Sequence, residues 1–487
     1  MKSWSPGIAL LALAIGGQAA ALSLFEAPHY AVYQHYRPFS QLFLPANSVA
    51  LATLATQATV CVLLAIRARA DLLSAVRNAV PRWWLLSCLG ILAFAAAVPT
   101  QSVGRFGGEV AASVAVMVLA GTNLILAVRA IPDSGLERIA AFVARRLSVE
   151  ESPSRRRWDT RIPRLAALWV ALAASLLAYF VWEAVPHIDD SIAYLFQAKY
   201  MSLGKLWLPR PDDPESFGVA HLLVDGDRWY GKFFPGWPSV LAIGVLAGAP
   251  WLVSPLLGAA SILLAHRFLT RNYGVRVAHG GVLLLAVSPW FLFMSASFMA
   301  HAVALFLLLL SVVAIDALRD RDSWVLALLA GASLGMLFLT RPFDAALVGP
   351  VVGLWALGVG GTRLRVTNLF AIGVSAALVA SLYFVYNGLL TGDVLTAPHR
   401  LWSDRVFGIG VDRFGFGRDI GPSLWSNMDP LPGHGLADVI LNANKNLSSV
   451  NFELFGWGCG SLVLALIGFQ PGVLRRKDAL VLRPVKE

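Results

Sequence analysis

Long runs of apolar residues follow one another along nearly the whole chain and are separated by short polar segments. A helix that crosses the hydrocarbon core of a bilayer needs about 20 apolar residues, and on that measure the pattern predicts about twelve spans. The run 237–249 is too short to cross and predicts an interfacial or re-entrant helix. The expected fold class is an all-α polytopic membrane protein, with spans at 7–25, 46–66, 83–98, 109–128, 165–184, 251–269, 277–296, 300–318, 324–339, 343–359, 369–390 and 452–469.

The composition agrees with this pattern. Residues are 57% hydrophobic and only 14% charged, whereas water-soluble domains carry about 25% charged residues. We therefore expect lipid to be the solvent for most of the chain, which makes the lipid bilayer its first partner. The cysteines, Cys61, Cys88 and Cys459, all fall inside apolar runs. They suggest neither a disulfide framework nor a cysteine-based metal site.

The formal net charge of +10 comes from arginines that cluster in alternate loops. Because Lys and Arg in short loops mark the cytoplasmic side of a membrane, we expect 67–82, 131–164 and the tail 471–487 to lie inside. Both termini are then cytoplasmic, and the chain is expected to be a multi-pass protein of the bacterial inner (plasma) membrane. The basic run in 131–164 could instead bind nucleic acid or anionic lipid. Orientation explains it without a further assumption, and no nucleic-acid partner is predicted.

The same loop divides the chain. Residues 1–130 form an N-terminal four-helix membrane module of unknown role, and 131–164 form a basic cytoplasmic linker. Residues 165–470 form a membrane core with two large outer loops, 185–236 and 391–450. The first apolar run could end in a signal-peptide cleavage site, although its length favours an uncleaved span.

Two adjacent carboxylates are the first candidates for chemistry. Asp189 and Asp190 follow the span 165–184, which starts at the basic loop and must therefore end on the outer side. Solvated surface charge would explain such a pair without any function. A carboxylate at the membrane edge could also act as a general base, removing a proton from a hydroxyl or amine acceptor, which contributes about 10²–10⁴ in rate.

Cationic side chains in the other outer segments are the second group of candidates. A leaving phosphate needs fixed cations rather than a general acid, and Lys232, His301, Arg341 and Arg400 are placed to supply them. Each also has a simpler explanation: a lysine at the interface, a structural histidine at a helix start, or charge that flanks a span. Arg341 stands out because it lies between two apolar runs, where ionisable residues are usually functional or paired.

These residues occur in an order that resembles a known family. The landmarks are Asp190-Ser191-Ile192-Ala193-Tyr194, Tyr230-Gly231-Lys232-Phe233-Phe234-Pro235-Gly236-Trp237-Pro238, Thr340-Arg341-Pro342, Tyr386-Asn387, and Phe414-Gly415-Phe416-Gly417 followed by His434. They are similar to landmarks of the bacterial GT-C glycosyltransferases, a group related to the protein O-mannosyltransferases and aminoarabinose transferases (glycosyltransferase family 39-like). The resemblance covers about 165–469 and implies a GT-C fold with short interfacial helices in the first outer loop.

The resemblance also implies site roles. An acid four residues before an aromatic is the catalytic centre of that family, which points to Asp190 before Tyr194. Ser191 stands where a Glu is usual, and Asp189 could supply the second acid. Lys232 resembles the lysine that binds the lipid phosphate. Tyr194 and His434 are expected to make weaker contacts with the acceptor or within the loops. Small members of the family need no metal, whereas the oligosaccharyltransferase branch uses one, and no cofactor is predicted here.

The resemblance implies a polyprenyl-phosphate sugar donor and transfer with inversion to an acceptor outside the membrane. A glycolipid or cell-envelope glycan is expected as acceptor rather than a folded protein, because acceptor recognition must use the membrane core and the two outer loops. A membrane transporter or lipid flippase is the alternative, although transporters usually show repeats and interrupted helices near the midplane. A non-catalytic scaffold is a third interpretation, which would leave the outer carboxylates without a shared site.

Overall fold

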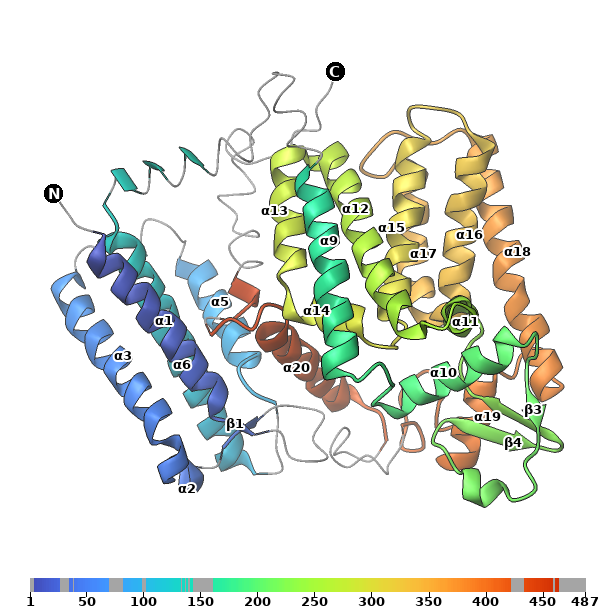
Figure 1. The fold of residues 1–487 in the computed structure, drawn as a ribbon, viewed down its shortest axis with the longest axis horizontal. Helices are drawn as coiled ribbons and strands as arrows, with labels where there is room; N and C mark the ends of the chain where they lie inside the picture. Colours follow the sequence, from blue (N-terminus) through green and yellow to red (C-terminus); the bar gives the residue numbers. More distant parts are fainter. Residues whose placement is uncertain are drawn as a thin grey trace. The chain divides into compact units, whose positions relative to one another are not determined.

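The structure is a computed structural model that describes residues 4–26, 35–37, 39–69, 82–98, 102–132, 134–135, 137–138, 141–142, 161–421, 433–458 and 460–463 (Figure 1). It divides into two compact units. The first unit comprises Met1–Arg146 and Arg413–Leu482, and the second comprises Leu147–Asp412 and Arg483–Glu487. The predicted basic linker lies mostly outside the described residues, and the predicted tail 471–487 lies wholly outside them.

The first unit is built from apolar helices that bury a few polar side chains. Helices α1 and α6 pack along each other, and α1 also packs against α3. Gln57 of α3 is 2% exposed, and a Cβ atom at Gly17 of α1 would lie 2.0 Å from its Oε1 atom. The absence of a side chain at Gly17 makes room for the Gln57 amide in this position. The elements are α1 (Ser5–Ser23), β1 (Phe25–Glu26), β2 (His35–Tyr36), α2 (Phe39–Leu42), η1 (Pro45–Asn47), α3 (Ser48–Arg67), α5 (Arg82–Phe94), α6 (Val103–Ala130) and α20 (Leu436–Glu453).

The segment that follows residue 412 is part of this first unit. The side chain of Gln18 in α1 accepts a hydrogen bond from the backbone N–H of Gly458 at 3.0 Å. Asn444 of α20 donates to the carbonyl oxygen of Ala97 at 3.1 Å. Apolar side chains also connect α20 to the N-terminal part of the unit, since the ring centroids of Phe25 and Phe452 lie 5.6 Å apart.

This arrangement differs from the predicted outer loop 391–450. The structure instead contains two helices there, α19 (Pro398–Val406) in the second unit and α20 in the first. Helix α20 was missed because the side chains that it buries are largely polar, Asp438, Asn444, Lys445, Ser448 and Asn451. Such a helix lacks the apolar stripe on which sequence patterns depend. The span expected at 452–469 lies largely outside the described residues.

The second unit is a helical bundle in which α12 packs against α9 and α15, and α16 packs against α15 and α18. Helices α16 and α18 approach closely at two glycines: a Cβ atom at Gly331 would lie 2.2 Å from the carbonyl oxygen of Ile372. Small residues spaced by four are typical of close helix pairs in membranes, and Gly335 continues the contact. The bundle elements are α9 (Arg161–Leu176), η2 (Leu177–Val181), η4 (Pro250–Leu252), α12 (Val253–Tyr273), α13 (Val275–Ala286), α14 (Pro289–Ala296), α15 (His301–Ala317), α16 (Trp324–Thr340), α17 (Pro342–Ala356) and α18 (Val366–Thr391).

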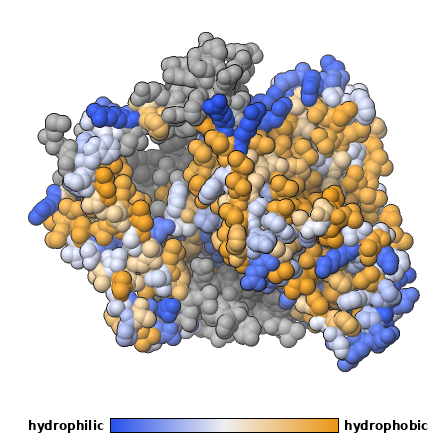
Figure 2. Space-filling view, viewed as in Figure 1, coloured by the Kyte–Doolittle hydropathy of each residue, from blue (hydrophilic) through white to orange (hydrophobic). Residues whose placement is uncertain are grey.

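The helices have the length and composition of a multi-pass membrane protein. Among the described residues, six are long and apolar enough to cross a bilayer, or seven if the bent pair of α13 and α14 counts as one span. The two helices of that pair meet at 63°. Helices α15, α16 and α17 are apolar but shorter, so the predicted number of twelve spans is not confirmed. Figure 2 shows hydrophobic residues between hydrophilic ones at the two ends of the second unit's helices.

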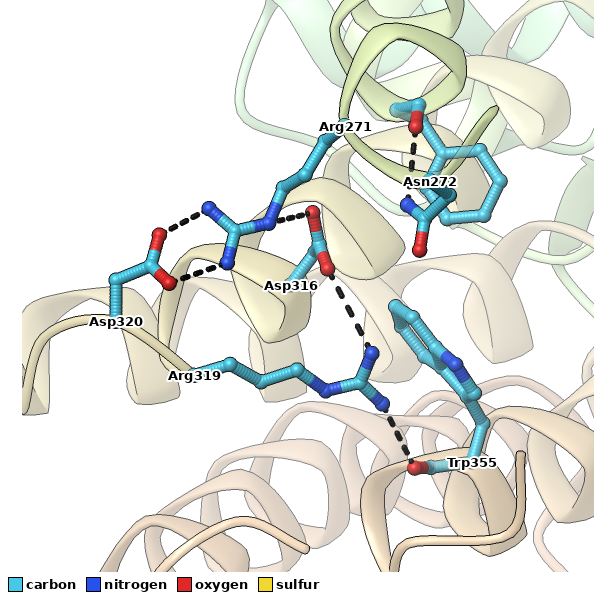
Figure 3. Close-up of polar contacts among 7 residues, drawn as sticks. Arg271, Asn272, Asp316, Arg319, Asp320 and Trp355 are labelled. Carbon is cyan, nitrogen blue, oxygen red and sulfur yellow. Dashed lines mark hydrogen bonds and ion pairs between the residues drawn. The ribbon is translucent and has the colours of Figure 1, made fainter. Parts of the chain in front are cut away.

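A charged cluster joins three helices at one end of this bundle (Figure 3). Asp316, in the last turn of α15, has a side chain that is only 5% exposed, and its oxygens pair with Nε of Arg271 at 2.5 Å and Nη1 of Arg319 at 3.6 Å. Arg319 also donates to the carbonyl oxygen of Trp355 at 3.0 Å and lies over that ring. Arg271 reaches Asp320 as well. The cluster fixes α12, α15 and α17 to one another.

The segment predicted to be the first outer loop, 185–236, lies at the other end of α15 and contains a helix and a small sheet (Figure 1). The strands run antiparallel in the order β3-β5-β4, with Leu223 opposite Tyr230. The resemblance predicted short helices here, and the sheet was not predicted because its strands are only two to four residues long. The elements are α10 (Asp189–Ser202), β3 (Leu208–Pro209), η3 (Pro214–Phe217), β4 (Leu222–Asp225), β5 (Arg228–Gly231) and the short helix α11 (Gly236–Leu246).

Helix α19, from the second outer segment, packs against this sheet. Its residue Arg405 donates to the carbonyl oxygen of Val224 at 3.0 Å and pairs with the carboxylate of Asp225. The two segments predicted to be outer loops are therefore joined to each other within the second unit. Asp190, His221 and Lys232 lie where α10, the sheet and α19 meet.

Candidate functional site

The first turn of α10 carries both predicted acids, Asp189 and Asp190. Carboxylates are favoured at this end of a helix because its N–H groups carry partial positive charge. The environments of the two side chains differ. Asp189 is exposed, whereas Asp190 is about one-third exposed and its Oδ1 atom lies 2.8 Å from Nε2 of His221. His221, rather than Asp189, contacts the Asp190 carboxylate.

Tyr194 lies one turn after Asp190 on the same helix and is buried. Its ring stacks on that of Phe233, with centroids 4.1 Å apart. Burial, and then the negative charge of Asp190, raise the pKa of the Tyr194 phenol above its usual value, so this group stays neutral. The stack ties α10 to the segment that carries Lys232.

Lys232 directly follows β5 and is only 6% exposed. Its ammonium group lies 3.6 Å from the centroid of the Trp402 ring and 5.3 Å from that of Phe233. Burial lowers the pKa of Lys232 to about 8, although Asp190 and Asp412 act in the opposite direction. Among the described residues, no carboxylate pairs with this ammonium group within 4.0 Å. Lys232 is thus a desolvated cation held against aromatic rings and available to an anion.

The sequence analysis missed His221, the residue that links these two groups. Its ring contacts Trp402, with centroids 4.9 Å apart, and its backbone carbonyl accepts a hydrogen bond from the N–H of Lys232 at 2.9 Å. The backbone of His221 has a φ of +70°, a conformation that is uncommon outside glycine. No local pattern marks this residue, because strand pairing in a sheet of very short strands brings it to Asp190.

The charges around Asp190 keep its carboxylate ionised. Burial alone would raise its pKa, but the hydrogen bond from His221 and the electrostatic interactions with His221, Lys232 and His399 outweigh burial. The resulting pKa of Asp190 lies below its usual value. At neutral pH the group is therefore a carboxylate that can accept a proton or a hydrogen bond.

Two further predicted residues, His301 and Arg341, lie within electrostatic range of the site formed by Asp190, His221 and Lys232. His301 begins α15, and the charges of Arg341, Asp344 and Asp190 all act on it. Arg341 precedes α17 and pairs with Asp344 three residues later. Because a carboxylate already neutralises Arg341, the structure favours Lys232 over Arg341 as the first contact of an anion.

Arg400 and His434 do not contact the site formed by Asp190, His221 and Lys232. Arg400 lies on α19 with its Nε atom 3.8 Å from Asp404, and it is 53% exposed. Its neighbour His399 faces the cluster instead, with its charge acting on Asp190 and its Nδ1 atom 3.1 Å from Asp412. His434 belongs to the first unit, where its backbone pairs with Gly417, so it enters no argument about Asp190.

Within the described parts of the chain, no group of three His, Cys, Asp or Glu side chains is placed to hold a metal ion. The polar residues gathered around Asp190 offer a base, a histidine donor and a buried cation. Such a set suits the removal of a proton from one reactant beside an anionic part of another.

No family model, curated protein or solved structure matches this chain. Its function is therefore inferred from the residues themselves and from the resemblance described above.

Proposed function

We propose that this chain is an integral membrane glycosyltransferase that moves a sugar from a polyprenyl-phosphate carrier to an acceptor outside the membrane. A glycolipid or cell-envelope glycan is the proposed acceptor, and the bacterial inner membrane the proposed location. The observation that carries the proposal is that two groups lie in one site. One is an ionised Asp190, which His221 contacts, and the other is a buried Lys232 that has no carboxylate partner among the described residues.

The phosphate of the donor is assigned to Lys232. A buried ammonium group is unfavourable unless an anion or a dipole compensates it, and the rings of Trp402 and Phe233 lie close to this one. A phosphate would add a charge-assisted hydrogen bond, which is among the strongest polar contacts in proteins. Arg341 and His301 lie close enough to contribute to the field around the leaving group.

Asp190 is assigned as the general base. It accepts the proton of an acceptor hydroxyl as that oxygen bonds to the anomeric carbon of the sugar. The bond between the anomeric carbon and the phosphate oxygen breaks, and the polyprenyl phosphate leaves with the bonding electron pair. Attack from the face opposite the leaving group inverts the anomeric carbon. Lys232 offsets the charge that develops on the phosphate, where fixed cations contribute most to rate.

The bilayer supports the choice of a lipid-borne donor. The apolar helices place the chain in a membrane, and a polyprenyl chain of the donor would remain in the hydrocarbon region while its phosphate reaches the polar edge. The experiment that tests the proposal incubates the purified chain in detergent or vesicles with a panel of polyprenyl-phosphate sugars. Release of polyprenyl phosphate, with the sugar transferred to a glycolipid acceptor or to water, is expected for at least one donor, and no release with any donor contradicts the proposal.

A transporter or lipid flippase is the second candidate, and the bent pair of α13 and α14 is the observation that favours it. Interrupted helices of transporters bind their cargo at the break. Here the break consists of Val287 and Ser288, after which Pro289 begins α14. It carries no ionisable residue, whereas the ionisable groups near Asp190 come from the ends of β4 and β5 and from α10, α15 and α19. Flux of a labelled lipid across vesicles without any covalent change would favour this alternative.

A further inference from the structure

His221 is the point where the acid and the cation of the site are physically connected. Its Nε2 atom lies 2.8 Å from Oδ1 of Asp190, and its carbonyl oxygen accepts the backbone hydrogen bond of Lys232 at 2.9 Å. One residue thus sets the position of the Asp190 carboxylate through its side chain and of Lys232 through its backbone. A shift of His221 would disturb both groups.

The conformation of His221 is costly for the protein. A φ of +70° places a residue with a Cβ atom in the left-handed region, where such residues occur rarely and where backbone strain is stored. Nothing in the turn itself requires a histidine, since glycine or asparagine would adopt this backbone more readily. The choice of histidine is explained by its side chain, which reaches Asp190.

The ring surroundings restrict which hydrogen bond His221 makes. Its Nδ1 atom is buried and has no hydrogen-bond partner in the described structure, and the rings of Trp402 and Phe233 pack against it. Asp190 is the polar partner that remains, so an Nε2–H group donates to its carboxylate. A histidine held in this way orients the carboxylate and stabilises its ionised form.

Resting on the proposed function, we infer that His221 is the positioning residue for the base: it holds Asp190 ionised and aimed at the acceptor hydroxyl, without itself binding the donor phosphate. Loss of the His221 donor then lowers the rate of transfer and raises the pH at which Asp190 becomes protonated. Donor binding, which depends on Lys232, stays nearly unchanged. These expectations separate positioning of the base from general support of the fold.

Other groups near Asp190 also affect its titration. Lys232 after β5 and His399 on α19 lower its pKa together with His221, while Tyr194 on its own helix and His301 on α15 lie within electrostatic range of its charge. Replacing His221 leaves these four groups in place. A change in the pH profile of a His221 variant is therefore assigned to loss of the His221 side chain, through its hydrogen bond and its electrostatic interaction with Asp190.

The test uses full-length protein with His221→Asn and His221→Gln. Asparagine tolerates the backbone conformation but is too short to reach Asp190, whereas the amide of glutamine can present an N–H group near the position of Nε2. The matched control is His187→Asn in the same segment, because His187 is exposed and its Nε2 atom and ring contact Trp182 rather than Asp190 or Lys232. Circular dichroism and thermal unfolding in detergent check that each variant is folded.

For His221→Asn we expect kcat to fall about tenfold or more, with KM for the donor within about twofold, and the acid limb of the pH profile to move up by about one unit. His221→Gln should recover part of both losses, and His187→Asn should match wild type. An unmoved acid limb, or a loss confined to donor KM, would overturn the inference.

A second measurement does not depend on transfer. A water-soluble carbodiimide reacts with protonated carboxyl groups, so the rate of labelling at Asp190, followed by mass spectrometry across pH 4–7, reports its protonation. We expect His221→Asn to label about tenfold faster than wild type. Identical labelling contradicts the inference even if transfer is found. Faster labelling without transfer by any donor contradicts the proposed function and leaves the role of His221 intact.

Discussion

The ammonium group of Lys232 lies 3.6 Å from the centroid of the Trp402 ring, a contact that joins the first outer segment of the second unit to α19. Trp402 also packs against His221. One indole therefore covers both Lys232, the residue proposed to bind phosphate, and His221, the residue proposed to position the base. Its burial of Lys232 explains why the pKa of the lysine falls while its charge is still favoured by the ring.

Replacing Trp402 with Leu is expected to raise the pKa of Lys232 towards its ordinary value, because water then reaches the ammonium group. The alkaline limb of donor binding should move to higher pH, and donor KM near pH 7 should change by severalfold through lost packing. Trp402→Phe retains an aromatic face and serves as the control. Equal pH profiles for the Leu variant and wild type would show that the indole does not desolvate Lys232.

Donor binding should depend on the charge of Lys232, whose pKa is lowered to about 8 mainly by burial. Below that pH the lysine is cationic and attracts phosphate; as pH rises through about 8 it loses its proton and donor KM should increase. Lys232→Met should raise donor KM by about tenfold or more at pH 7 and remove the dependence. Binding of a polyprenyl phosphate, measured by quenching of tryptophan fluorescence, checks this independently of transfer.

Asp190→Asn should reduce transfer by at least about a hundredfold, because the amide cannot accept the acceptor proton. In wild type the pKa of Asp190 is lowered, so activity should persist into mildly acidic solution and be lost only as pH falls through that lowered pKa. Asp189→Asn is the matched control, since Asp189 is its exposed neighbour. Turnover of a polyprenyl-phosphate sugar is the readout, and comparable losses in both variants would contradict a special role for Asp190.

The membrane class could be predicted from the sequence for one physical reason. Apolar runs report the solvent directly, and the run before Asp190 predicted an apolar helix before the acid, which the structure contains as α9. Lys232 was marked by its sequence context and is indeed buried. By contrast, His221 and Trp402 reach the site through pairing of short strands and docking of α19, and these long-range contacts leave no periodic pattern in the chain.

Helix α20 was not predicted because its polar composition suggested a loop. Its buried Asn444 satisfies carbonyl groups at the end of α5, and its buried Asn451 interacts with Met117 of α6. A helix that buries amides against other helices resembles a solvent-exposed segment when only its composition is read. Arg400 failed for a different reason: adjacent positions on a helix point in different directions, and His399 rather than Arg400 turns towards Asp190.

The charged cluster at the other end of α15 should contribute to the stability of the bundle rather than to catalysis. Asp316→Asn removes the shared partner of Arg271 and Arg319 and leaves Arg319, whose side chain is only 11% exposed, without a carboxylate partner among the described residues. Breaking a buried ion pair in this way costs about 3–5 kcal/mol, and the lower end is expected because Arg271 is about one-third exposed. Thermal unfolding in detergent measures the loss.

Asp320→Asn is the control, since that carboxylate is 62% exposed and a surface pair contributes about 0–1 kcal/mol. If both variants unfold at the wild-type temperature, the cluster does not hold α12, α15 and α17 together.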